Sequence, residues 1–198
     1  MDEAYRSYFK DGMAQSATIY NLTVELADVD RAVYETLDLR LARQPSESAE
    51  YLAARVLAYC LEYTEGISFS QGIAAGDEPA IWVRDLTGHP LAWIEVGMPD
   101  AERLHRGSKL ADRAAVYTHR TVEQLLTQLA RKKIHRAEAI PIYAFEKYFI
   151  AELASLIERR STMALSVTEQ QLYVEIGGRS LSSTLAEERL GAEGRDRD

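Results

Sequence analysis

The sequence predicts an α/β fold, in which helices flank a mixed β-sheet and additional β-hairpins lie near the two ends of the chain. Two observations support this prediction. Apolar and polar residues alternate over residues 18–41 and 163–176, and this period of two is typical of half-buried strands. Between them, short apolar stretches alternate with segments of helical period, as expected when helices cover a mixed sheet.

The length and composition fit one globular domain. The chain has 198 residues, of which 46% are hydrophobic and 27% are charged. We expect a single domain over residues 13–190, an N-terminal extension or leader over residues 1–12, and a disordered tail over residues 191–198. No apolar run is long enough for a membrane span, and Cys60 is the only cysteine. These features favour a cytoplasmic protein without a disulfide or a membrane partner.

The N-terminal part is predicted to form a β-hairpin followed by a helix. Residues 18–26 and 33–41 alternate in polarity and are separated by a short turn. Apolar residues at helical spacing then predict a helix over about residues 47–63, with Ser46 as its N-cap. Glu50 lies on the core-facing side of the first turn, so its carboxylate should meet either the edge of a pocket or a cation.

Alternating strands and helices are predicted for the rest of the chain. The expected strands are residues 80–86, 91–97, 114–118, 139–145, 163–167 and 171–176, and the expected helices are residues 99–111, 121–133 and 146–159. The strands around Ile81 and Ile94 should be antiparallel neighbours, and the last two strands should form a hairpin. Gly177 and Gly178 are interpreted as a simple exit from that hairpin.

The charge is unevenly distributed along the chain. The formal net charge is -8, which argues against indiscriminate tight binding to nucleic acid. Residues 103–136, however, contain only two acids, Asp112 and Glu123, and nine basic residues: Arg103, Arg106, Lys109, Arg113, Arg120, Arg131, Lys132, Lys133 and Arg136. Either this stretch supplies solvated basic helix faces, or it forms a basic rim beside an acidic pocket, which would suit a polyanionic ligand.

Three carboxylates around one predicted hairpin give the main chemical signal. Asp77 and Glu78 stand at the start of its first strand, and Glu95 lies within its second strand. Glu95 interrupts an apolar strand, and a buried ionised carboxylate needs a metal ion or a cation as its partner. Converging carboxylates suit Mg²⁺, which could activate water toward a phosphodiester. Alternatively, Asp77 and Glu78 cap a loop, and Glu95 pairs with an arginine.

The chain resembles the YaeQ family over nearly all of residues 13–176. Four stretches carry the resemblance: Ala17-Thr18-Ile19-Tyr20, Leu41-Ala42-Arg43-Gln44-Pro45-Ser46-Glu47, Gly76-Asp77-Glu78-Pro79 and Trp93-Ile94-Glu95-Val96-Gly97-Met98-Pro99-Asp100. This resemblance implies a variant of the restriction-endonuclease-like fold, also called the PD-(D/E)XK nuclease fold. The predicted order of strands and helices permits that fold.

The resemblance also implies where a nuclease site would lie. The usual pattern is an Asp, a spacer, and then an acid, any residue and a Lys. Asp77 takes the first place and Glu95 the second, but the third falls on Gly97 instead of Lys. In some relatives the following helix supplies the lysine, and Arg106 and Lys109 are the candidates here. Arg106 stands where many members of the family have Lys, but arginine stays protonated and is a poor group to deprotonate water.

Two functions therefore remain open from the sequence. The first is a Mg²⁺- or Mn²⁺-dependent phosphodiesterase acting on nucleic acid. In it, Asp77, Glu95, Glu50 and Glu78 would hold the metal, and Lys109 or Arg106 would stabilise phosphate charge. Here Glu50 corresponds to the helix acid that some members of the superfamily add to the metal cluster. The second is a non-catalytic binding or regulatory module with a degenerate site, which the missing lysine at Gly97 and the acidic net charge favour. Of the four histidines, only His105 lies near the predicted site.

Overall fold

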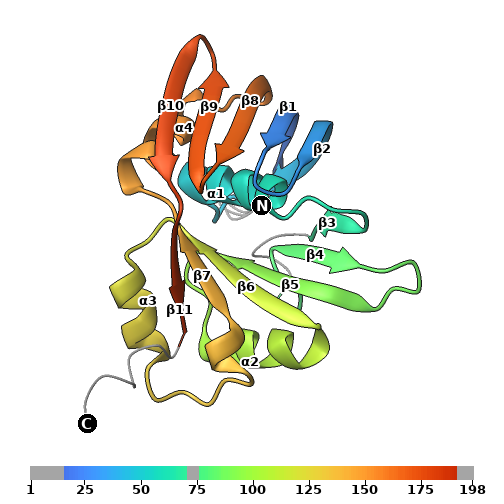
Figure 1. The fold of residues 1–198 in the computed structure, drawn as a ribbon, viewed down its shortest axis with the longest axis vertical. Coiled ribbons are helices and arrows are strands. Elements are labelled where there is room, and N and C mark those ends of the chain that lie inside the picture. Colours follow the sequence, from blue (N-terminus) through green and yellow to red (C-terminus); the bar gives the residue numbers. More distant parts are fainter. Residues whose placement is uncertain (1–15, 71–75, 191–198) are drawn as a thin grey trace, which may run out of the picture.

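The computed structural model describes residues 16–70 and 76–190, which form two β-sheets and four α-helices. Figure 1 shows the layers: α1 lies between the first sheet and the second sheet, α4 packs beside α1 against the first sheet, and α2 and α3 cover the opposite face of the second sheet. The α/β prediction is confirmed, and the predicted terminal hairpins join each other to form a separate sheet. The predicted leader at residues 1–12 and the predicted tail at residues 191–198 lie outside the described residues.

The first sheet joins the two predicted hairpins. Its strand order is β10-β9-β8-β1-β2, and β1 and β8 are parallel while the other pairs are antiparallel. The hairpins pair with each other because both carry one apolar face that needs the same helices for cover. Gly177 and Gly178, with positive φ angles of 56° and 73°, form a turn into a further strand and are not a simple exit. The strands are β1 (Thr18–Asp28), β2 (Val33–Arg43), β8 (Arg160–Thr168), β9 (Gln171–Ile176) and β10 (Arg179–Thr184).

The second sheet contains the predicted central strands. Its order is β11-β7-β6-β5-β4-β3, with β5, β6 and β7 parallel. Ile81 pairs with Ile94 in the antiparallel β4–β5 ladder, as predicted. Because β5, β6 and β7 are parallel, their carboxyl ends lie at one edge of the sheet. The strands are β3 (Ile67–Phe69), β4 (Ile81–Arg84), β5 (Pro90–Val96), β6 (Arg113–Thr118), β7 (Pro141–Ala144) and β11 (Ala186–Arg189).

The helices begin and end somewhat differently from the sequence prediction. They are α1 (Ala49–Leu61), α2 (Ala101–Leu110), α3 (Val122–Leu129) and α4 (Lys147–Leu156). Ser48, not Ser46, is the N-cap of α1, and its hydroxyl accepts from the backbone N–H of Tyr51 at 3.1 Å. Helix α3 ends before the predicted residue 133, since Arg131 adopts a left-handed backbone with φ of 60°. A 3₁₀ turn, Ala137–Ala139, precedes β7.

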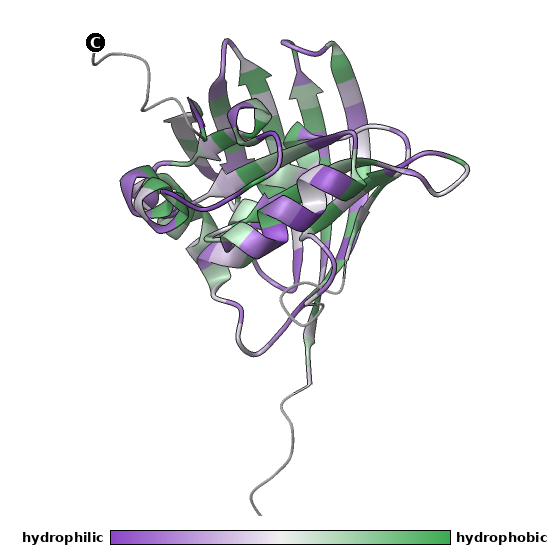
Figure 2. Ribbon diagram, turned by 90° about the horizontal axis from the view of Figure 1, so that it is seen from below, coloured by the Kyte–Doolittle hydropathy of each residue, from purple (hydrophilic) through white to green (hydrophobic). Residues whose placement is uncertain are grey.

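Two apolar clusters hold the layers together. The larger one packs the first sheet, α1 and α4 against one face of the second sheet, and Cys60 is fully buried in it. The smaller one packs Trp82 and Trp93 of the second sheet against α2 and α3. At Gly107 of α2, a Cβ atom would lie 2.4–2.5 Å from the Trp93 ring, so only glycine allows this close approach. Figure 2 shows the alternation of hydrophobic and hydrophilic residues along the strands.

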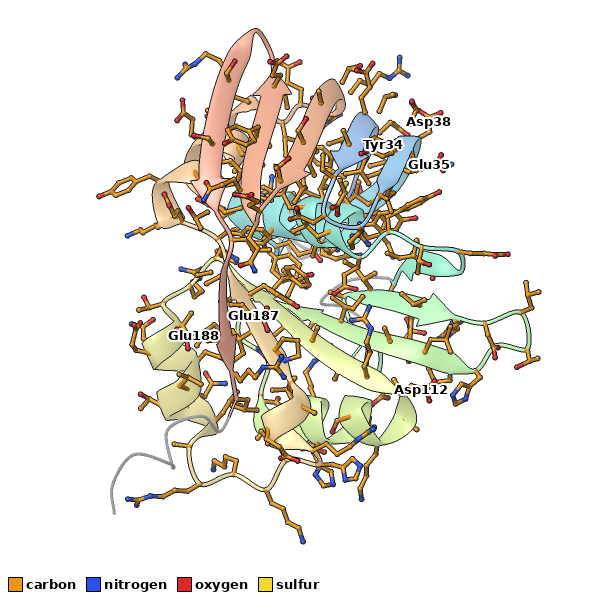
Figure 3. The ribbon with its side chains drawn as sticks, in the orientation of Figure 1. Tyr34, Glu35, Asp38, Asp112, Glu187 and Glu188 are labelled. Carbon is orange, nitrogen blue, oxygen red and sulfur yellow. The ribbon has the colours of Figure 1, made fainter. Side chains whose placement is uncertain are left out.

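Charged side chains lie on one edge strand of each sheet, where a further strand could otherwise be added. Glu35 and Asp38 lie on β2, the edge strand of the first sheet, beside the exposed Tyr34 (Figure 3). Glu187 and Glu188 lie on β11, the edge strand of the second sheet. Such charges oppose edge-to-edge association of sheets. Within the described residues, no helix is long and apolar enough to cross a membrane.

Candidate functional site

A pocket of about 430 Å³ lies at the carboxyl ends of the parallel strands β5 and β6. The chain leaves β5 into residues 97–100 and leaves β6 into His119 and Arg120, and helices α1 and α2 both begin here. Ligands of open α/β sheets commonly bind at the carboxyl ends of parallel strands. We call this cavity the β5–β6 pocket; its lining includes Ser48, Tyr51, Glu95, Arg103, His119 and Arg120.

Glu95 is buried at this pocket and both of its carboxylate oxygens accept hydrogen bonds. Its side chain is only 4% exposed. Oε1 accepts from the Trp93 indole N–H at 2.7 Å and from Arg103 Nε at 3.1 Å, while Oε2 accepts from Arg103 Nη2 at 3.1 Å. This is a bidentate ion pair between β5 and the first turn of α2. The interpretation in which Glu95 pairs with an arginine therefore describes its geometry.

Arg103 binds more than the carboxylate. Its Nη1 donates to the backbone carbonyl of Gly76 at 3.0 Å, and its Nη2 donates to the backbone carbonyl of Glu78 at 2.6 Å. The guanidinium therefore lies among four oxygen atoms, two from Glu95 and two from the chain just before β4. Burial raises the pKa of Glu95 above its ordinary value, while the hydrogen bonds and charge of Arg103 act in the opposite direction.

The other predicted metal ligands are not gathered around Glu95. Asp77 has a 90% exposed side chain and pairs with Arg106, which also lies 3.6 Å from Glu102. Glu78 enters the cluster through its backbone carbonyl. In residues 16–70 and 76–190, no three His, Cys, Asp or Glu side chains lie close enough together to hold a metal ion. In this arrangement the carboxylates therefore do not fit a Mg²⁺ or Mn²⁺ ion.

Glu50 and Lys109 also lie apart from Glu95. Glu50 is half-buried in the first turn of α1, where its own backbone N–H and the Ser48 hydroxyl lower the pKa of its carboxyl group. Lys109 is exposed in the last turn of α2. Neither residue is among the lining of the β5–β6 pocket.

Gly97 has a structural reason to differ from the lysine of the nuclease pattern. Its backbone has a φ of +88°, a conformation that side-chain-bearing residues rarely adopt. A Cβ atom at this position would lie 3.5 Å from the Tyr51 ring and 3.9 Å from the His119 ring. Tyr51 and His119 therefore occupy the space into which a side chain at position 97 would point.

Four residues of the pocket were not predicted from the sequence as site residues: Tyr51, His119, Arg120, and Arg103 as the partner of Glu95. Burial raises the pKa of Tyr51, and burial followed by the charge of Arg120 lowers the pKa of His119. Both ring nitrogens of His119 are buried without a hydrogen-bond partner among the described residues. For His119 and Arg120, the signal available in the sequence was their position directly after a short buried strand. His105, in contrast, lies on α2 outside the pocket lining.

Much of the basic stretch is used inside the structure. Arg103 and Arg106 pair with Glu95 and Asp77, and Arg113 pairs with the buried Glu62, which also accepts from the Tyr117 hydroxyl at 3.0 Å. Arg136 caps the C-terminus of α2 by donating to the carbonyls of Ser108, Ala111 and Asp112. Six basic residues of the stretch have no ion pair to a described residue: Lys109, Arg120, Arg131, Lys132, Lys133 and Arg136.

The fold and the pocket define a class: an α/β domain of two mixed sheets with a polar pocket at the ends of parallel strands. A family model described as "YaeQ protein" matches residues 13–185. The uncharacterized protein YaeQ of Escherichia coli (strain K12) is 31% identical over 164 residues, which cover 82% of this chain and 90% of that protein. The corresponding YaeQ of Salmonella typhi is 30% identical over 164 residues, which cover 82% of this chain and 90% of that protein. The chain therefore belongs to the YaeQ family.

Solved structures agree with this assignment. The crystal structure of YaeQ from Xanthomonas axonopodis pv. citri matches with a TM-score of 0.80 and 27% sequence identity, covering 88% of this chain and 99% of that one. The crystal structure of YaeQ from Pseudomonas syringae matches with a TM-score of 0.78 and 29% identity, covering 86% and 95%. The two-sheet architecture is thus shared with YaeQ proteins that have been crystallised.

Proposed function

We propose that this chain is a non-catalytic binding module with a degenerate nuclease-like site, and that it takes an anionic ligand in the β5–β6 pocket. One observation carries the proposal: the Arg103 guanidinium binds both oxygens of Glu95 and places a positive charge where a metal ion would have to approach the central acid of the nuclease pattern. A carboxylate held in this way by a guanidinium serves the fold and the shape of the pocket. It does not serve as an open metal ligand.

The proposed kinship with PD-(D/E)XK nucleases is supported by the order of elements around the pocket. Helix α1 is followed by the antiparallel strands β3, β4 and β5, then by α2, and then by β6 parallel to β5. Asp77 and Glu95 lie before β4 and within β5, at the places the nuclease pattern gives to its acids. The proposed module would thus retain the frame and two acids while using Arg103 as the counter-ion.

The proposed ligand class follows from the groups that remain available. Arg120 lines the pocket, is exposed, and has no ion pair among residues of the described structure. Ser46 and Tyr51 add hydroxyl groups to the same lining. A guanidinium with hydroxyl donors beside it suits a phosphate or a similar anion, and nucleic acid is the partner class that would present phosphates to it.

The test combines binding, metal and cleavage measurements on the full-length chain. Binding of a short fluorescent oligonucleotide should weaken steeply with salt and should be lost in Arg120→Met. Mn²⁺ should give no thermal stabilisation, because the oxygens of Glu95 are occupied. The proposal fails if Mn²⁺ stabilises the wild type but not Glu95→Gln, and if the same substitution abolishes cleavage of nucleic acid. That result would restore the Mg²⁺- or Mn²⁺-dependent nuclease, with Arg103 displaced in its active state.

A further inference from the structure

We propose that a second cavity continues the β5–β6 pocket, and that the ligand carries two linked phosphate groups, one for each cavity. The second cavity has a volume of about 530 Å³ and lies at the carboxyl ends of β6 and β7. We call it the β6–β7 pocket. This inference rests on the proposed function, because it extends the ligand that the β5–β6 pocket would bind.

His119 and Arg120 connect the two cavities. Both residues line the β5–β6 pocket and the β6–β7 pocket, so they form a shared wall at the end of β6. Both ring nitrogens of His119 are buried and lack a hydrogen-bond partner in the part of the chain that the structure describes. A buried polar atom without a partner is costly. The end of β6 therefore joins the two cavities through His119 and Arg120.

The β6–β7 pocket has a cation of its own. Lys147 lines this cavity only, and neither Lys147 nor Arg120 forms an ion pair with a residue in the described ranges. The acid in the lining is Glu146, directly before Lys147. One unpaired cation therefore belongs to the second cavity, and one belongs to the wall between the cavities. Two anionic groups on a connected chain match this arrangement better than a single one.

Backbone donors support the same assignment. Helices α3 and α4 both begin at the β6–β7 pocket, and neither Thr121 nor Glu146 caps its helix with a side-chain hydrogen bond. By contrast, Ser48 and Asp100 cap the two helices that begin at the β5–β6 pocket. The first-turn N–H groups of α3 and α4 are thus left without side-chain caps beside the two cations. Such groups favour anionic ligands.

The experiment compares ligands with one and two phosphates on the full-length chain by calorimetry. The probes are inorganic phosphate, thymidine 5′-monophosphate, a 5′-phosphorylated thymidine dinucleotide and propane-1,3-diyl bisphosphate. The variants are Lys147→Met, Arg120→Met and the control Arg159→Met, which removes an exposed cation beyond the other end of α4. Methionine retains an aliphatic chain in each case. Amide chemical shifts of Gly97 and Ala144 report on the two cavities separately.

The inference predicts that the dinucleotide binds at least about tenfold more tightly than the monophosphates, since a second charge-assisted contact is added. Lys147→Met should reduce the affinity for the dinucleotide to that for the monophosphates. Arg120→Met should weaken the binding of every probe, and Arg159→Met should weaken the binding of none. Ala144 should shift with the dinucleotide only. If the propane bisphosphate matches the dinucleotide, the ligand is a small bisphosphate; if it binds as weakly as the monophosphates, a nucleic acid strand is indicated.

Two results would overturn this inference, and they differ from a failure of the proposed function. Suppose that monophosphates bind and that their binding depends on Arg120. If the dinucleotide then binds no more tightly than they do, or if its affinity is unchanged in Lys147→Met, the second cavity is not part of the site. In that case the β5–β6 pocket remains an anion-binding site, and the proposed role of the β6–β7 pocket is wrong. If no probe binds and no amide shifts, both proposals fail together.

Discussion

The ion pair between Glu95 and Arg103 predicts an asymmetric response to losing either partner. Removing one partner of a buried pair costs about 3–5 kcal/mol, because the other charge stays buried without compensation. Arg103→Met leaves a carboxylate whose side chain is 4% exposed, with the Trp93 indole as its remaining hydrogen-bond donor among the described residues. We therefore expect the full cost, which corresponds to a fall in Tm of about 6–20 °C for a chain of this size.

Glu95→Gln should cost less. The Arg103 side chain is 24% exposed and keeps its hydrogen bonds to the carbonyls of Gly76 and Glu78, so its charge remains partly solvated and partly bonded. The glutamine oxygen can still accept from Trp93 or Arg103. We expect a loss of about 1–3 kcal/mol, or a fall in Tm of about 2–12 °C. The double variant Glu95→Gln/Arg103→Met should lose less than the sum of the single variants.

The assay is thermal and urea unfolding with and without Mn²⁺, at pH 7 and pH 5. In Arg103→Met the folded-state pKa of Glu95 should rise further above its unfolded value, since the opposing charge has gone. A carboxyl group with a raised folded-state pKa favours folding at low pH and loses that contribution as pH rises. The difference in unfolding free energy between the wild type and Arg103→Met should therefore be smaller at pH 5 than at pH 7. A Glu95→Gln variant as stable as the wild type without metal would refute the ion-pair argument.

Three further predictions test other parts of the site and its support. Gly97→Lys should destabilise the fold by about 1–3 kcal/mol, because φ is +88° there, and should not create Mn²⁺ binding by calorimetry. Gly107→Ala should cost about 1–3 kcal/mol or more in urea unfolding, since its Cβ would lie 2.4–2.5 Å from Trp93. The wild type should lose stability as pH falls below about 6.5, because burial lowers the folded-state pKa of His119 and the unfolded chain takes up the proton first. His119→Gln should lack this component of the pH profile, and an unchanged profile would contradict the assignment.

The local elements were predictable because their signals are local. The alternation over residues 18–41 predicted β1 and β2, and the polarity pattern around Ile81 and Ile94 predicted their antiparallel pairing. The pairing of β1 with β8 could not be predicted in this way, because it joins residues more than 130 positions apart through backbone hydrogen bonds. Short strands such as β3, with three residues, carry too few positions to show a period.

The candidate site was also predictable only where its signal is local in the sequence. A carboxylate in an apolar strand predicted that Glu95 is buried and needs a partner, and both properties are observed. The partner could not be identified, because a metal ion and an arginine satisfy the same electrostatic requirement. The sequence does not single out His119, because its four histidines show no metal-ligand spacing. Its place beside Tyr51 depends on how α1 packs against the second sheet, which a single sequence does not display.

The contacts of Arg103 also decide which cation remains available for a ligand. Arg103 donates four hydrogen bonds to oxygens of the protein, so drawing it toward an incoming phosphate would leave Glu95 buried and unpaired. Arg120 has no such commitment, since it is exposed and forms no ion pair with any residue in the described part of the chain. Binding through Arg120 therefore leaves the ion pair between Glu95 and Arg103 intact. Binding through Arg103 would break this ion pair, so the loss of fold stability would reduce the ligand affinity. A ligand that raises the Tm of the wild type and of Glu95→Gln equally would identify Arg120 as the binding cation.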